Sequence, residues 1–120
     1  ELISFGAKRS SFETVLIVCG IAQPETLIIE LRKKYKVEVL LFADHHNFDY
    51  SDIKQIHQKF DTFALENTAI ITTEKDYVRL QTKLTADELE NYPWYYLPIE
   101  LKIENEDEFN FLIKKYVTAI

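Results

Sequence analysis

An acid and two histidines, Asp44, His45 and His46, come almost directly after VEVLLF, an apolar run at residues 37–42. These are two of the three histidines in the chain. Imidazole is the side chain that titrates near neutral pH, and it most readily serves acid-base or metal chemistry. The pattern therefore indicates a functional loop. A structural explanation stays open, in which Asp44 caps a turn and the histidines are solvated or satisfied.

The stretch Thr73-Glu74-Lys75-Asp76 follows a second apolar run, TAIIT at residues 68–72. Thr73 and Asp76 form the Thr-x-x-Asp pattern of a capping box, and Asp76 with Arg79 has the spacing of a helical ion pair. A helix start explains most of this stretch. Lys75 fits less well, because a lysine in the first turn opposes the helix dipole. It needs an acid or a bound anion nearby, and a phosphate would suffice.

A third candidate stretch, GIAQP, follows the apolar run VLIVC at residues 15–19. Gly20 can supply a turn and Pro24 a helix start, so a purely structural role is open here too. Cys19 lies inside the apolar run, where a thiol is a poor nucleophile. His57 flanks the apolar face of its helix, four residues after Ile53, and we expect it to pack at the edge of the core.

Several kinds of site are disfavoured by spacing. Adjacent residues rarely direct both side chains at one ion, and no Cys-x-x-Cys or His-Glu-x-x-His spacing is present, so we expect no metal site. Neither a Walker A nor a Gly-x-Gly-x-x-Gly sequence occurs, and the chain has only two glycines. A phosphate-cradling glycine loop therefore cannot be built from this sequence.

The candidate stretches alternate with helical patterns. Short apolar runs predict strands at 15–19, 37–42, 68–72 and 94–101, with Pro98 placing the last at a sheet edge or ending it early. Apolar periodicity and caps predict helices at 21–35, from Ser51 through Phe63, from Thr73 through Leu80, and at 105–117. This alternation predicts a three-layer α/β/α sandwich with a mainly parallel sheet of about four strands. The three candidate loops then share the edge where parallel strands end, the usual ligand-binding rim of open α/β folds.

Composition narrows the class of protein. The 120 residues suit one core, and the net charge of −6 argues against a nucleic-acid partner, despite a local cluster at Arg32, Lys33, Lys34 and Lys36. No apolar run approaches a membrane span, so we expect a soluble chain, and a single cysteine fits a reducing compartment. Because the chain lacks methionine, we expect a piece of a longer protein. Residues 1–13 are then a connector from a missing N-terminal domain, and residues 14–120 form a C-terminal α/β domain.

The stretches CGIAQP, FADHHNF and TTEKDYVRL, in this order and one strand-helix unit apart, resemble the C-terminal part of tetraacyldisaccharide 4'-kinase, the lipid A 4'-kinase of Gram-negative bacteria. The resemblance covers about residues 15–100. It implies an ATP- and Mg²⁺-dependent transferase that phosphorylates the 4'-hydroxyl of tetraacyldisaccharide 1-phosphate at the cytoplasmic face of the inner membrane. The P-loop, the principal catalytic aspartate and the membrane anchor of the family belong to its other domain. This chain alone is therefore expected to be inactive and to bind neither ATP nor Mg²⁺.

The resemblance also implies residue roles. His45 would face the kinase cleft and assist the aspartate that activates the sugar hydroxyl, while Asp44 would orient the imidazole. The remaining rim residues would support the domain contact or an anionic group of the lipid A precursor; they are Gly20, His46, Glu74, Lys75, Asp76 and Arg79.

Two other interpretations remain open. A metal phosphoesterase of the Asp-His-His type needs further aspartate motifs at strand ends, and none is found. A non-catalytic interaction module would tolerate substitution of the rim residues. The tripeptide alone does not separate these possibilities, but GIAQP and TEKD beside it favour the kinase.

Overall fold

A five-stranded sheet is the centre of the computed structural model, which describes residues 2–63 and 67–98. The strand order is β1-β5-β4-β2-β3. Strands β2, β3, β4 and β5 are parallel, and β1 pairs antiparallel with β5. The strands are β1 (Ile3–Ser4), β2 (Thr14–Cys19), β3 (Lys36–Leu41), β4 (Thr68–Thr73) and β5 (Trp94–Leu97). The predicted mainly parallel sheet is confirmed.

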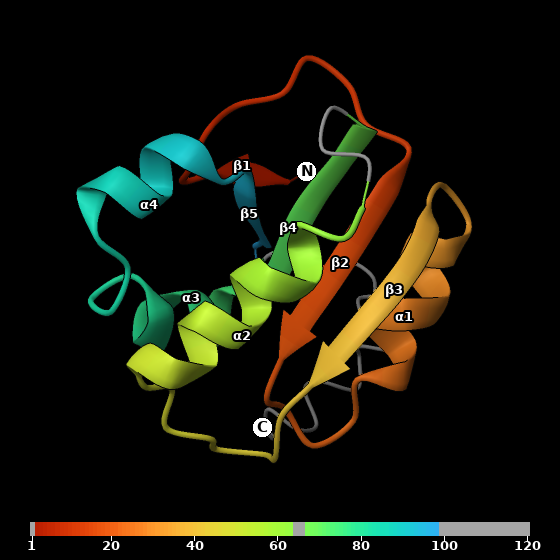
Figure 1. Ribbon diagram of the computed structural model, residues 1–120. Helices are drawn as coiled ribbons and strands as arrows, with labels where there is room; N and C mark the ends of the chain where they lie inside the picture. The colour runs from red at the N-terminus through yellow and green to blue at the C-terminus, as the bar shows by residue number, and fades with distance from the viewer. Residues whose placement is uncertain (1, 64–66, 99–120) are drawn as a thin grey trace.

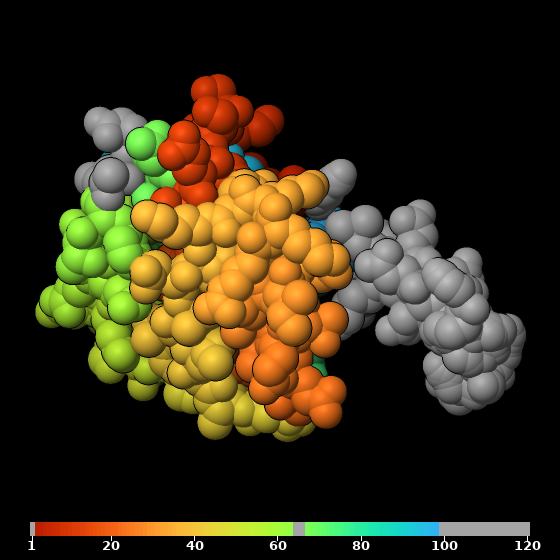
Figure 2. Space-filling model, turned by 90° about the vertical axis from the view of Figure 1, so that its right-hand side faces the viewer, coloured from red at the N-terminus to blue at the C-terminus, as the bar shows by residue number. Residues whose placement is uncertain are grey.

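Helices cover both faces of this sheet, which confirms the three-layer architecture (Figure 1). Helix α1 (Glu25–Arg32) packs Leu27 and Leu31 against one face. Helix α2 (Tyr50–Phe60) and α3 (Glu74–Leu80) lie on the other face and belong to a second core cluster around Trp94. Alternate residues of β2 enter the two clusters, and Val15 through Val18 are fully buried. Helix α1 and strand β3 form the side of the molecule seen in Figure 2.

Two helix starts differ from the prediction. Helix α2 is capped by Asp49 and not by Ser51, because the Asp49 carboxylate accepts the backbone N–H of Asp52 at 3.0 Å while the Asp52 carboxylate accepts that of Asp49 at 2.9 Å. Ser51 lies inside the helix. Pro24 is the N-cap of α1 and not its first helical residue. The predicted cap of α3 is confirmed, since the Thr73 hydroxyl accepts the backbone N–H of Asp76 at 3.0 Å.

Two elements were not predicted. Strand β1 lies within the expected connector and is only two residues long, and its neighbour Phe5 contacts the rings of Tyr77 and Trp94. Helix α4 (Ala86–Asn91) buries none of its own residues.

Strand β5 ends at Leu97, directly before Pro98, and it lies between β1 and β4 and not at a sheet edge. The helix predicted at 105–117 falls outside the described residues.

Candidate functional site

Three loops meet at the carboxyl ends of the parallel strands, as the sequence predicts. The strands β2 and β3 point to the same edge, and the loop after β3 runs across it (Figure 1). The backbone N–H of His45, after β3, donates to the Gly20 carbonyl, after β2, at 3.2 Å. The backbone N–H of Gly20 donates to the carboxylate of Asp76, after β4, at 2.9 Å. Hydrogen bonds therefore join all three loops into one rim.

Gly20 allows these loops to approach closely. A Cβ atom at this position would lie 2.8 Å from the carbonyl oxygen of Ala43 and 3.3 Å from the Cβ of His46. Its φ angle is not positive, so the requirement for glycine is steric and not conformational. The loop that carries the histidines rests directly on Gly20.

Asp76 is the buried centre of the rim. Its residue is fully buried, although an ionised carboxylate loses much hydration energy there unless it is paired. One carboxylate oxygen accepts from the Gly20 N–H at 2.9 Å and from the Thr73 hydroxyl at 3.0 Å. The other accepts from the Arg79 guanidinium at 3.3 Å. These partners compensate the burial, and they come from two strand ends and one helix.

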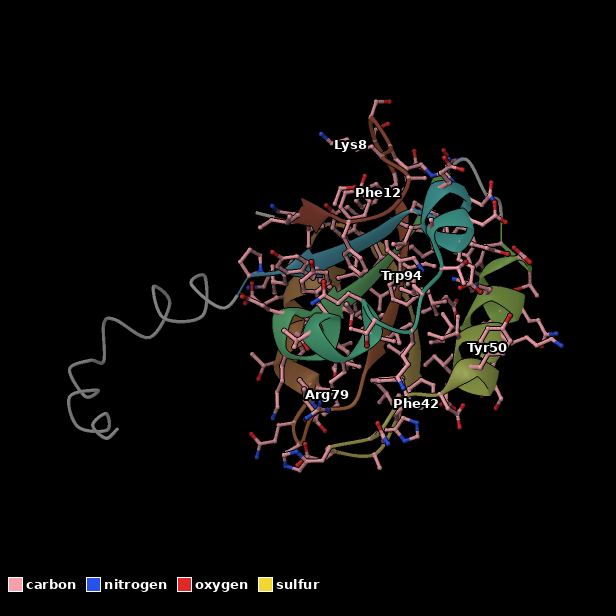
Figure 3. All side chains as sticks on the ribbon, turned by 90° about the vertical axis from the view of Figure 1, so that its left-hand side faces the viewer. Lys8, Phe12, Phe42, Tyr50, Arg79 and Trp94 are labelled. Carbon is pink, nitrogen blue, oxygen red and sulfur yellow. The ribbon has the colours of Figure 1, made fainter. Side chains whose placement is uncertain are left out.

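His45 carries an exposed imidazole at the rim. Its side chain is 70% exposed, and its backbone is left-handed, with φ of 64°. Its Nε2 atom lies 3.5 Å from the Asp44 carboxylate, and its Nδ1 atom lies 3.4 Å from Nη2 of Arg79. A guanidinium can only donate, so a hydrogen bond at this contact requires Nδ1 to accept, which is the Nε2–H tautomer of the ring. Figure 3 shows Arg79 at the same end of the molecule as Phe42, opposite Lys8.

His46, in contrast, is part of the packing. Its ring contacts those of Phe42 and Phe48, and its Nε2 atom is 2.7 Å from the carboxylate of Asp52 on α2. Burial by itself would raise the pKa of Asp52, but the hydrogen bonds from His46 and from the Asp49 N–H outweigh it and lower that pKa. His46 therefore ties the rim loop to α2, and the sequence analysis did not identify Asp52 as its partner.

The other two rim candidates, Glu74 and Lys75, begin helix α3. Glu74 is half-buried and Lys75 is exposed. Within the described part of the chain, Lys75 has no hydrogen bond or ion pair, so the anion expected beside it stays a prediction. The rim thus presents Lys75 as an exposed cation next to the network around Asp76 and Arg79.

Two other titratable groups, Cys19 and His57, are buried and are not members of this hydrogen-bond network. Burial raises the pKa of the Cys19 thiol to about 11, and the nearby charge of Asp76 adds to the effect. His57 is buried as expected: its Nε2 accepts from the Trp94 indole N–H at 3.1 Å, its ring stacks on Tyr92, and burial lowers its pKa. It borders a pocket of about 290 Å³ between α2 and α4, which the sequence analysis did not find.

Two features of residues 2–63 and 67–98 bear on metal and phosphate binding. No group of three His, Cys, Asp or Glu side chains is placed to hold a metal ion in these ranges. The N–H of Gly20 is already used by Asp76, and a backbone nest for phosphate needs free N–H groups. In the same ranges, no helix has the length and apolar character needed to cross a membrane.

Comparison with known proteins assigns this rim to a family. Residues 4–118 match the model of the family described as tetraacyldisaccharide-1-P 4'-kinase. The tetraacyldisaccharide 4'-kinase of Bacteroides fragilis is 40% identical over 116 residues, which cover 92% of this chain and 31% of the relative. That of Flavobacterium psychrophilum is 41% identical over 105 residues, covering 87% and 27%. That of Bartonella henselae is 26% identical over 93 residues, covering 76% and 26%.

No solved structure matches the chain. The chain spans about a third or less of the length of these curated relatives. The match covers the three loops of the rim, and it favours the kinase over the metal phosphoesterase. On this match over nearly its whole length, the chain belongs to the tetraacyldisaccharide-1-P 4'-kinase family.

Proposed function

We propose that this chain is the C-terminal part of a kinase that transfers a phosphoryl group from ATP to the 4'-hydroxyl of tetraacyldisaccharide 1-phosphate, in lipid A biosynthesis. Family membership and the partial coverage of the relatives support this proposal. Among the described residues, no three His, Cys, Asp or Glu side chains are grouped to hold a metal ion. ATP and Mg²⁺ would be held by an N-terminal P-loop domain of the same longer protein, which also brings the enzyme to the cytoplasmic face of the inner membrane.

The observation that carries the proposal is the exposed imidazole of His45, held between Asp44 and Arg79 at the strand ends. Phosphoryl transfer is catalysed mainly by positioning and by charge stabilisation, with a group that orients the nucleophile. The Nε2–H of His45 can donate a hydrogen bond across the cleft, toward the carboxylate that removes the proton of the 4'-hydroxyl. Asp44, 3.5 Å away, limits the rotation of the ring.

Other rim residues take supporting roles in this proposal. Lys75 is an exposed cation beside the site, and a cation of this kind can pair with a phosphate of the lipid substrate. Glu74 precedes it at the helix start and lies at the contact with the missing domain. Gly20 and His46 shape the loop that presents His45.

Substitution of His45, Asp44 and His46 in the full-length enzyme tests the proposal. His45→Ala should lower kcat by roughly 10²- to 10⁴-fold, the usual contribution of a positioned acid-base group, with little loss of stability because the side chain is exposed. Asp44→Asn should give a smaller loss. His46→Ala should lower kcat least of the three rim variants but should lower the melting temperature, because it breaks the bond to Asp52.

His57→Ala is the matched control. His57 is buried beside Trp94, away from the rim, so its loss should reduce stability while the folded enzyme keeps its turnover. Steady-state kinetics with thermal melts on each purified variant separate the two effects. Near-normal turnover in His45→Ala would refute the assignment, as would a loss of activity that merely follows the loss of stability.

A further inference from the structure

The orientation of His45 cannot come from packing. Its side chain is 70% exposed, so no apolar surface fixes the ring. Its left-handed backbone and the hydrogen bond from its N–H to the Gly20 carbonyl fix the direction of the Cα–Cβ bond. They do not fix the side-chain torsion angles that orient the ring. Polar contacts to Asp44 and Arg79 must therefore set the rotation of the ring and the position of its proton.

Of these two partners, Arg79 is the better anchored. The Arg79 side chain is 28% exposed, and its Nη1 atom donates to Asp76 at 3.3 Å while Nη2 reaches His45 at 3.4 Å. The Asp44 side chain is 38% exposed, and its carboxylate lies 3.5 Å from Nε2 of His45. A guanidinium presents several donors in one rigid plane, so fixing one end of it also fixes the direction of the other.

Asp76 supplies the fixed end. It is fully buried, and its second oxygen is held by the Gly20 N–H and the Thr73 hydroxyl. A continuous chain of polar contacts therefore links Gly20 at the end of β2 to Asp76, Asp76 to Arg79, and Arg79 to Nδ1 of His45. Gly20 takes part twice, since its carbonyl accepts the N–H of His45.

We propose that Asp76 and Arg79 are positioning residues, which hold the His45 imidazole in one orientation and in its Nε2–H tautomer. Asp76 fixes the guanidinium, and the guanidinium occupies Nδ1, so the ring proton is kept on Nε2, the nitrogen on the side of Asp44. The effect on turnover rests on the function proposed above for His45. The effect on the tautomer does not.

The tautomer is measured first, in the full-length protein labelled with ¹⁵N-histidine. Two-bond ¹H–¹⁵N spectra distinguish protonated from unprotonated ring nitrogens, and His45→Ala assigns the resonance. At about pH 8, His45 should carry its ring proton on Nε2 and not on Nδ1. Arg79→Gln and Asp76→Asn should raise the population of the Nδ1–H tautomer. The control Arg32→Gln, at an exposed arginine in the last turn of α1, should leave the spectrum unchanged.

Kinetics then test the link to catalysis. Arg79→Gln should lower kcat by about tenfold with KM within about twofold, and it should have no further effect in the His45→Ala background, because residues that act through one another are not additive. Arg79→Lys should not restore turnover, since one ammonium group does not reproduce the planar fork of the guanidinium.

The outcomes separate the two proposals. An unchanged His45 tautomer in Arg79→Gln overturns the positioning role, whatever the activity of that variant. Full rescue by Arg79→Lys also overturns it, because charge alone would then suffice. Normal turnover in His45→Ala overturns the function proposed for His45, while the tautomer measurement still decides the role of Arg79. If Asp76→Asn does not fold, Arg79→Gln is sufficient for the decision.

Discussion

Replacing Gly20 by alanine tests whether the rim depends on close approach between its loops. The added Cβ would lie 2.8 Å from the Ala43 carbonyl oxygen, which belongs to backbone and cannot rotate away. The loop that carries His45 must then retreat by roughly half an ångström, at a cost of about 1–3 kcal/mol in the free energy of unfolding. A misplacement of about 1 Å can lower turnover by about 10²-fold, so a shift of half that size should lower kcat by about tenfold.

Gly6→Ala is the matched control for this experiment. Its Cβ would lie 2.9 Å from the backbone nitrogen of Trp94 and would also meet the carbonyl oxygen of Tyr92, so it too should be destabilising. Gly6 follows β1 and lies away from the three rim loops. It should therefore lower stability without lowering kcat. If Gly6→Ala does not fold, Ile56→Val in the core of α2 replaces it, with a cost of about 0.5–1.5 kcal/mol.

The assay compares kcat with denaturant unfolding for each full-length variant. Gly20→Ala should lose both stability and turnover, and the control should lose stability alone. The reasoning fails if the Gly20 variant keeps full turnover, because the loop would then have absorbed the clash without moving His45. It also fails if both variants lose turnover in proportion to their stability.

Three further predictions follow from the pKa shifts. Burial raises the pKa of the Cys19 thiol to about 11. The thiol should therefore resist iodoacetamide at about pH 8 in the native protein and should react after denaturation. Rapid labelling of the folded protein would contradict this prediction. The lowered pKa of Asp52 means that its carboxylate stabilises the fold above pH 3.8, and that this stability is lost as the pH falls through the lowered pKa. The difference in unfolding free energy between wild type and Asp52→Asn should therefore shrink in acid. A difference that stays constant with pH would contradict this prediction. Burial lowers the pKa of His57, so His57 takes up a proton in the unfolded chain before it does so in the folded protein as the pH falls below 6.5. The free energy of unfolding should therefore decline in this pH range, and it should decline less in His57→Gln. An identical pH profile for His57→Gln and wild type would count against the effect.

Strands β2 and β4 could be predicted from sequence because each is a short apolar run buried on both faces. Strand β1 could not, since two residues carry no period and its place depends on pairing with β5. Helix α4 has no apolar stripe that would predict it, because none of its residues is buried. Its one local sequence signal is the Thr-x-x-Glu pattern of Thr85 and Glu88, which form a capping box. At α2 several polar residues compete to cap, and Asp49 rather than Ser51 pairs with Asp52.

The rim was predictable as a set of loops but not as a network. Parallel strands bring their carboxyl ends together, and this rule located Gly20, Asp44 and Asp76 on one edge. The spacing of Asp76 and Arg79 also predicted their ion pair, which is present at 3.3 Å. The contact of Arg79 with His45 and that of Asp76 with Gly20 depend on the tilt of α3 against the sheet. No local pattern reports this tilt, so these contacts required coordinates.

The hydrogen bond between Gly20 and Asp76 also has a consequence for folding kinetics. It joins residues 56 positions apart, and the contact of Arg79 with His45 spans 34 positions. Contacts between distant residues form slowly, because the closure of long loops must precede them. Strand β2 pairs with β4, across the intervening α1, β3 and α2, before Asp76 can reach Gly20. We therefore expect the rim to be assembled late, after the helices have formed.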